Sequence, residues 1–234
     1  MTAIAQFSGP IVDWTWIGAN SGLIWTQLVQ HLVLTAIAIG VGFGISLPLA
    51  IIAARWRMTY GPITWISALL FTIPSIALFA LLIPITGLTM WTAEIGLVSY
   101  TLLILIENIV TGVDSVPPPV LEAADGVGYG PWRRFRDVEL PLATPAIVAG
   151  LRVATVTTVG LVTVTALIGY GGLGAIILLG LQNLRLNEIV VGSVLSVLLA
   201  AILDLALAAL ERSITPWRRG SGSARPATFA DGVR

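Results

Sequence analysis

Residues Leu32–Ala54 read LVLTAIAIGVGFGISLPLAIIAA. This stretch indicates the fold class of the protein, because it is 23 residues long and contains no charged side chain. A hydrocarbon core about 30 Å thick is crossed by about 20 apolar residues in a helix. Four further apolar stretches of similar length follow, over residues 63–83, 95–113, 146–168 and 190–210. The sequence therefore predicts an all-α, polytopic membrane protein with five transmembrane helices.

The composition of the whole chain agrees with this fold class. Of its 234 residues, 56% are hydrophobic and 10% are charged, whereas a soluble domain has about 25% charged residues. This excludes a soluble enzyme, a disordered chain and a nucleic-acid-binding protein. With no cysteine and one histidine, the chain also lacks the ligands of the usual zinc sites. We therefore expect no metal site and no catalytic residue.

The segments outside the spans divide the chain into three parts. Residues 1–31 contain three tryptophans and several polar residues, which favours an interfacial segment, with a sixth span as the alternative. Residues 32–212 form the membrane domain, and residues 213–234 are expected to form a disordered cytoplasmic tail.

The arginines predict the orientation of the chain. Ten of the 12 lie in the first connection, in the third connection or after the last span, and the opposite side holds only Arg185. Because cytoplasmic loops carry the excess of basic residues, we expect the N-terminus outside and the C-terminus in the cytoplasm.

The third connection, residues 114–145, is the longest polar segment between two spans. Trp132, Phe135 and Val138 recur at i, i+3 and i+6, which predicts an apolar stripe on a short helix. A solvated linker helix is the alternative. The stripe favours a helix that binds a partner or the membrane surface.

A wider pattern in the same connection resembles the EAA signature loop of bacterial ABC importer permeases. It consists of Glu122-Ala123-Ala124, then Gly128, then Val138, Leu140 and Pro141, with valine where isoleucine is usual. Three other stretches resemble the branch of this family that imports glycine betaine, carnitine, choline and proline betaine. They are His31-Leu32, Thr72–Leu78 and Ala166–Gly174.

The resemblance implies the function and the partners of the chain. It implies a permease subunit in the bacterial cytoplasmic (inner) membrane that works with two ATPase subunits, a second identical or homologous permease and an extracytoplasmic solute-binding protein. The ATP and Mg would be bound by the ATPases, because this chain contains no lysine and cannot form a phosphate-binding loop. The residues expected to couple to the ATPase are Glu122, Ala123, Ala124, Gly128, Trp132, Phe135, Val138, Leu140 and Pro141.

Two alternatives to this function stay open at this point. Within the same class, the chain would be an importer permease for methionine or another small polar solute. In another class, it would be an ion-coupled carrier or a membrane scaffold that transports nothing. A carrier would use Glu107 or Asp204 as its ion site.

Three ionisable side chains lie within the predicted spans, namely Glu107, Arg152 and Asp204. Each lies six residues from the cytoplasmic end of its span, or about 9 Å at a rise of about 1.5 Å per residue. Because charged side chains are disfavoured inside a bilayer, we expect Arg152 to lie between the two acids and to join the third, fourth and fifth spans. The alternative is that Arg152 extends to the headgroups.

Pro74 is the proline within a span that most favours a hinge. Thr72 and Ser75 beside it can bind the backbone carbonyl that a proline leaves free.

Two further groups are candidates for the solute pathway. Aromatic rings attract quaternary amines by cation–π interaction, which makes candidates of Phe71, Phe79 and Tyr100. Glycines after the fourth span are expected at the turn into a short re-entrant segment, and the candidates among them are Gly171, Gly172 and Gly174.

Overall fold

The computed structural model of the chain describes residues 10–216, and the elements in that range are all helices. Four are long and apolar enough to cross a membrane: α2 (Ser21–Arg55), α5 (Met90–Asp114), a continuous run over Pro131–Ile168 and α10 (Leu186–Ile214). A fifth span is formed by the bent pair α3 (Arg57–Thr72) and α4 (Ser75–Thr86). The prediction of an all-α bundle with five spans is confirmed for the described part of the chain.

The N-terminal part differs from the expected boundary. Helix α2 begins at Ser21, eleven residues before the predicted start of the first span, so it includes the last third of the expected interfacial segment. Two polar residues in this first part of α2 contact other segments, since Gln30 accepts a hydrogen bond from Gly172 and His31 donates one to Val159 of the fourth span. A short helix, α1 (Trp14–Ala19), precedes it and is capped by Asp13. The hydrogen bond from the Thr15 hydroxyl lowers the pKa of Asp13.

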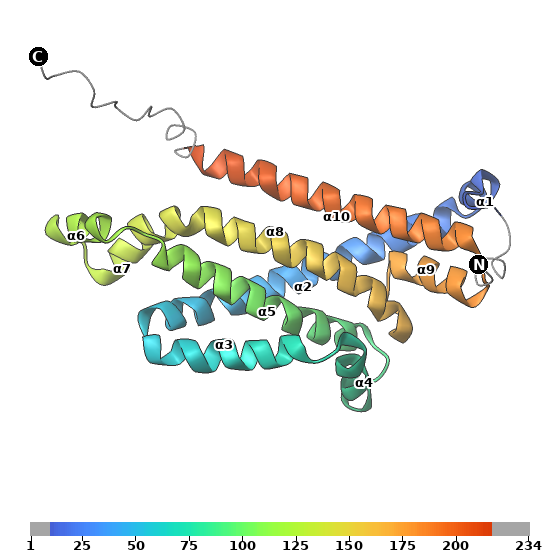
Figure 1. The fold of residues 1–234 in the computed structure, drawn as a ribbon, viewed down its shortest axis with the longest axis horizontal. Coiled ribbons are helices and arrows are strands. Elements are labelled where there is room, and N and C mark those ends of the chain that lie inside the picture. Colours follow the sequence, from blue (N-terminus) through green and yellow to red (C-terminus); the bar gives the residue numbers. More distant parts are fainter. Residues whose placement is uncertain (1–9, 217–234) are drawn as a thin grey trace, which may run out of the picture.

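The second predicted span is broken rather than straight. Helices α3 and α4 meet at an angle of 95°, and Figure 1 shows α4 turned away from the axis of α3. The break falls at Ile73 and Pro74, where Ile73 has an extended backbone (ψ 126°). Proline disfavours the α conformation in the residue before it, which accounts for the break at this position.

The centre of the bundle is formed by α2, α5 and α8 (Leu140–Val164), each of which packs against the other two, and Figure 1 shows α2 crossing behind α5 and α8. Small residues allow the helices to approach closely. A Cβ on Gly42 would lie 2.0 Å from Thr101 Oγ1, and one on Gly150 would lie 2.5 Å from Asn108 Cβ. Such small-residue contacts are typical of helix packing in membranes.

A short apolar helix, α9 (Leu173–Gln182), follows the fourth span and packs against α10 and α2. It begins after a tight turn at Gly172 (φ +49°), whose N–H donates to Gln30 Oε1 at 3.0 Å. His31 is fully buried beside this turn, and its Nε2 donates to the Val159 carbonyl oxygen at 3.1 Å. The helix is too short to cross a bilayer, in agreement with a re-entrant segment.

The connections between spans collect at the two ends of the bundle. The α2–α3 connection, helix α6 (Pro118–Gly126), helix α7 (Pro131–Arg134) and the end of α10 lie together at one end (Figure 1). Helices α1 and α9 lie at the other. Of the expected tail, only residues 213–216 are described, and residues 217–234 lie outside the described part of the chain.

Candidate functional site

Helix α6 carries the Glu122-Ala123-Ala124 motif and is bounded by residues that define both of its ends. Pro118 and Pro119 occupy its first two positions, where a missing N–H leaves no hydrogen bond unmade. At its other end Gly128 has a φ of +87°, and the Tyr129 N–H donates to the Ala124 carbonyl oxygen at 3.1 Å. This is the Schellman pattern, in which a glycine ends a helix at low energetic cost. Gly128 therefore ends α6 and turns the chain toward α7.

Part of the exposed surface of this loop is apolar. Glu122 and Ala123 are exposed on α6, whereas Ala124 is buried against the loop itself. Val127 is 74% exposed and Trp132 is 69% exposed. Figure 1 shows α6 and α7 projecting beyond the ends of the long helices. The loop surface thus combines the Glu122 carboxylate with exposed apolar side chains.

The expected apolar stripe on the second loop helix is wrong in part. Phe135 is 3% exposed and Val138 is half-buried, so neither shares the exposed surface of Trp132. The Trp132 and Phe135 rings lie 5.8 Å apart, but Phe135 is directed inward, with the Arg55 guanidinium carbon 5.1 Å from its ring centroid. A π-helical turn over Phe135–Glu139, in which the Leu140 N–H donates to the Phe135 carbonyl oxygen, then moves Val138 away from the 3.6-residue period.

The last two residues of the signature lie at the start of α8. Pro141 is in the first turn of α8, which begins at Leu140 and continues the helical run that starts at Pro131. Leu140 and Pro141 are half-buried, and Leu140 packs against the core cluster formed by α2, α5 and α8. They connect the loop to the bundle and are not part of its exposed surface.

Beneath the loop lies a group of charged side chains that the sequence reasoning missed. Arg134 contacts Asp125 at 2.6 Å and Glu139 at 3.0 Å, and Arg55 lies 3.8 Å from Glu139. In the sequence, the close spacing of Arg134 and Glu139 was the available indication that these two side chains could pair. It gave no indication of Arg55, which is more than 70 residues away in the sequence.

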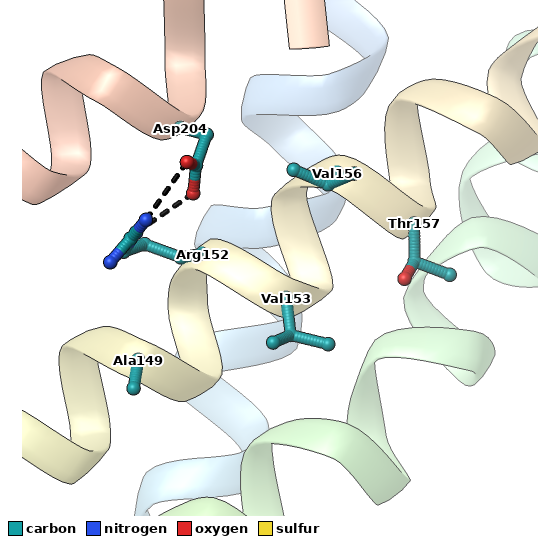
Figure 2. Close-up of a pocket in the computed structure, with 6 residues that line it drawn as sticks. All are labelled: Ala149, Arg152, Val153, Val156, Thr157 and Asp204. Atoms are coloured by element: carbon teal, nitrogen blue, oxygen red, sulfur yellow. Dashed lines mark hydrogen bonds and ion pairs between the residues drawn. The ribbon is translucent and has the colours of Figure 1, made fainter. Parts of the chain in front are cut away.

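The intramembrane charges are brought together only in part. Arg152 Nε and Nη2 donate to the two carboxylate oxygens of Asp204 at 2.7 and 2.8 Å, and Nη1 lies 3.7 Å from Glu211. Figure 2 shows Arg152 on α8 and Asp204 on α10 directed toward one another. Asp204 pairs with Arg152 as expected. Glu211, the second acid of this group, was not predicted.

The expectation that Glu107 also contacts Arg152 is wrong. Glu107 is exposed on α5, and the neighbouring Asn108 is the residue that packs against Gly150 of α8. Adjacent helix residues point in directions about 100° apart, so only one of the two can face α8. The ion pair therefore joins the fourth and fifth spans and does not include the third.

The Arg152–Asp204 pair borders a groove of about 460 Å³ between α8 and α10. Figure 2 shows the lining residues, which are Ala149, Arg152, Val153, Val156, Thr157 and Asp204. Most of this lining is apolar, and both carboxylate oxygens of Asp204 are occupied by the guanidinium group. No group of three His, Asp or Glu side chains suited to a metal is present within residues 10–216.

The break at Pro74 is closed by a residue other than those expected. Tyr100 Oη donates to the Ile73 carbonyl oxygen, the group that the break leaves free. The Thr72 hydroxyl instead binds the Ala68 carbonyl oxygen at 2.7 Å. The expectation that Thr72 covers the freed carbonyl is therefore wrong, because its hydroxyl reaches back one helical turn. Ser75 is half-buried at the start of α4.

The three aromatic candidates have different surroundings. Phe79 is 2% exposed and packs against Gly96, so it belongs to the core, at the edge of a small pocket lined also by Ile76 and Leu167. Tyr100 is 5% exposed and makes an edge contact of 5.9 Å with Phe71. Phe71 is 38% exposed, so it is the accessible member of the three.

The glycine candidates are required for close packing. A Cβ on Gly171 would lie 2.3 Å from Ala166, and one on Gly174 would lie 2.3 Å from the Thr163 carbonyl oxygen. A Cβ on Gly172 would lie 2.6 Å from His31 Cβ. These contacts hold α9 against α2 and α8, and all three glycines are buried.

Comparison with known proteins places this geometry in a family. Residues 46–219 match the family described as "Binding-protein-dependent transport system inner membrane component". The osmoprotectant import permease protein OsmW of Salmonella typhimurium is 37% identical over 84% of this chain and 94% of its own length. The glycine betaine/carnitine/choline transport system permease protein OpuCB of Bacillus subtilis is 34% identical over 86% of this chain and 93% of its own length.

A solved structure has the same fold. The MetNI methionine ABC transporter, in an inward facing conformation, matches with a TM-score of 0.71, over 84% of this chain and 98% of the matched chain. At 24% sequence identity this likeness concerns the fold alone.

Proposed function

Because the chain belongs to the family of binding-protein-dependent transport system inner membrane components, we propose that it forms the solute pathway of an ABC importer for osmoprotectants. The solute class is quaternary ammonium compounds such as glycine betaine, choline, carnitine and proline betaine. The chain itself is a permease subunit of a bacterial membrane, and its work is to open and close a route for the solute.

The observation that supports coupling to a separate ATPase is the exposed surface of the α6–α7 loop. Glu122, Val127 and Trp132 are exposed there, beyond the ends of the long helices. A protein surface rarely leaves such apolar groups together without a partner. We assign this surface to contact with one of two ATPase subunits, which bind ATP and Mg and which push the loop when they close.

The remaining partners follow from the same proposal. A second permease, identical or homologous, would complete the pathway, and an extracytoplasmic binding protein would deliver the solute to the end that holds α1 and α9. The basic connections gather at the opposite end, with Arg57 at the start of α3 and Arg133 in α7. The positive-inside rule then places that end and the C-terminus in the cytoplasm and the N-terminus outside.

The two alternatives have less support. As an ion site for a carrier, Asp204 is disfavoured because Arg152 binds both of its oxygens. Glu107 is not paired in this way, and the support against a carrier comes from the family match over residues 46–219. A methionine importer shares the fold, whereas OsmW and OpuCB, both above 30% identity to this chain, are permeases for osmoprotectants.

Reconstitution of the complete transporter in liposomes tests the proposal. The measurement is uptake of radiolabelled glycine betaine with ATP inside, binding protein outside, and proton and sodium gradients collapsed by ionophores. We expect uptake with ATP and none with a non-hydrolysable analogue. Uptake that needs an ion gradient and persists without ATP would contradict it. Titration of the binding protein with betaine, choline, carnitine and methionine identifies the solute.

A further inference from the structure

Glu139 is a buried carboxylate at the junction between the cytoplasmic loop and the bundle. Its side chain is 7% exposed and lies in the π-helical turn that precedes α8. Glu139 Oε1 accepts a hydrogen bond from Arg134 Nε at 3.0 Å and lies 3.8 Å from Arg55 Nη2. A carboxylate in such a place is tolerated because it is paired, here with guanidinium groups from two separate elements.

Arg134 extends this contact to the signature helix. Its Nη1 donates to Asp125 Oδ2 at 2.6 Å, and Asp125 directly follows Ala124 in α6. One guanidinium group therefore bridges α6 and Glu139. Bridging of two carboxylates by one planar guanidinium fixes their relative positions more strictly than a single ion pair does.

Arg55 extends the contact to the first span. It is the last residue of α2, and its Nη2 donates to the Pro131 carbonyl oxygen at 3.0 Å. Its guanidinium carbon also lies 5.1 Å from the centroid of the buried Phe135 ring. The end of α2 is thus attached to the start of the helical run that becomes α8, at Pro131 and Phe135 as well as at Glu139.

Helix α6 has little other contact through which a movement could pass. Ala124 is its single buried residue within the described chain, and the turn at Gly128 is open, since a Cβ added there would have no atom within 4 Å. Apolar packing alone therefore cannot couple α6 to the bundle. The polar route through Asp125, Arg134 and Glu139 is the specific connection.

We propose that Glu139 is a positioning residue that, through Arg134 and Arg55, transmits a displacement of α6 to the cytoplasmic ends of α8 and α2. The proposal rests on the proposed function, since it needs an ATPase that moves α6. The π turn around Glu139 is suited to this role, because such turns are sites where a helix can change its direction. The consequence is that both spans move as one when the loop is pushed.

The test compares uptake of glycine betaine with ATP hydrolysis in the complete reconstituted transporter. In Glu139→Gln the loop surface is intact, so ATPase subunits still bind, but the connection is lost. We expect the solute transported per ATP hydrolysed to fall about five-fold or more, the lower end of typical coupling between sites. A smaller change would overturn the proposal. The matched control is Asp137→Asn, which removes an acid from the exposed Arg133–Asp137 pair in the same turn and keeps the wild-type ratio.

A double variant separates transmission from folding. Glu139→Gln leaves Arg134 without one of its two partners, which can lower the amount of folded protein. Arg134→Gln combined with Glu139→Gln relieves this, so we expect assembly with the ATPase to recover while transport per ATP stays low. Recovery of both would assign these residues to stability alone and overturn the proposal. Failure of the proposed function would show differently, as absence of uptake by the unchanged chain.

Discussion

Replacement of Gly172 by alanine tests how α9 is held in the bundle. Gly172 has a φ of +49°, and an added Cβ would lie 2.6 Å from His31 Cβ and 2.8 Å from the His31 Cα and N atoms. These atoms belong to the backbone and first side-chain atom of α2, so they cannot move aside as the end of a long side chain can. The substitution therefore combines two separate effects, strain in the backbone at residue 172 and crowding of the new methyl group against His31.

The size of each effect can be estimated from this geometry. A residue other than glycine in such a backbone conformation costs about 1–3 kcal/mol. Crowding of a packed interior by an added methyl group costs about another 1–3 kcal/mol. Gly172→Ala should thus lower the free energy of unfolding by roughly 2–6 kcal/mol.

Two neighbouring glycines are matched controls, because each isolates one effect. Gly169 has a φ of +90° and no atom within 4 Å of its Cβ position, so Gly169→Ala shows the backbone effect alone. Gly174 has ordinary helical geometry, but its Cβ would lie 2.3 Å from the Thr163 carbonyl oxygen, so Gly174→Ala shows crowding alone. The loss in Gly172→Ala should be close to the sum of the other two.

The measurement is the free energy of unfolding of the purified chain, from titration with SDS in mixed micelles and detection by tryptophan fluorescence. Each variant is compared with the unchanged chain under the same conditions. Equal losses for Gly172→Ala and Gly169→Ala would refute the reasoning, since the contact between Gly172 and His31 would then contribute nothing.

Three further outcomes are expected. Arg152→Met leaves Asp204 unpaired in the membrane. It should therefore reduce the yield of folded protein, measured by size-exclusion chromatography, more than Arg152→Met combined with Asp204→Leu does. Equal yields would contradict the pairing. Tyr100→Phe removes the hydrogen bond to the Ile73 carbonyl oxygen and should lower the free energy of unfolding by about 0.5–1.5 kcal/mol, measured by the same SDS titration. Trp132→Ala should leave that free energy unchanged, because the side chain is 69% exposed, but should weaken ATPase binding in a pull-down; unchanged binding would place the contact elsewhere.

The signature loop shows where sequence reasoning reached its limit. Its exposed Glu122 and the turn at Gly128 could be predicted, because glycine chemistry and the family pattern are local properties. The burial of Phe135 could not be predicted, because it depends on the approach of Arg55, which is 80 residues away in the sequence. The same holds for Phe79, whose burial depends on the close approach of Gly96 from α5.

The intramembrane charges show a second limit of the same kind. Depth in the membrane follows from position along a helix, so Glu107, Arg152 and Asp204 could be placed at similar levels from the sequence. The direction of each side chain around its helix depends on how the helices are rotated against one another. That rotation turns Asn108 rather than Glu107 toward α8, and brings Glu211 near Arg152.

The amino-acid sequence was enough to predict a helical membrane bundle with a polar loop at its basic end. A span needs about 20 apolar residues in a row, and such stretches are visible in one sequence. Three features came from the folded bundle alone, namely the 95° bend at Pro74, the contact of Arg55 with Glu139 and the contact of Gly172 with His31. Each of these depends on contacts between segments distant in the sequence, which arise only when the helices pack together.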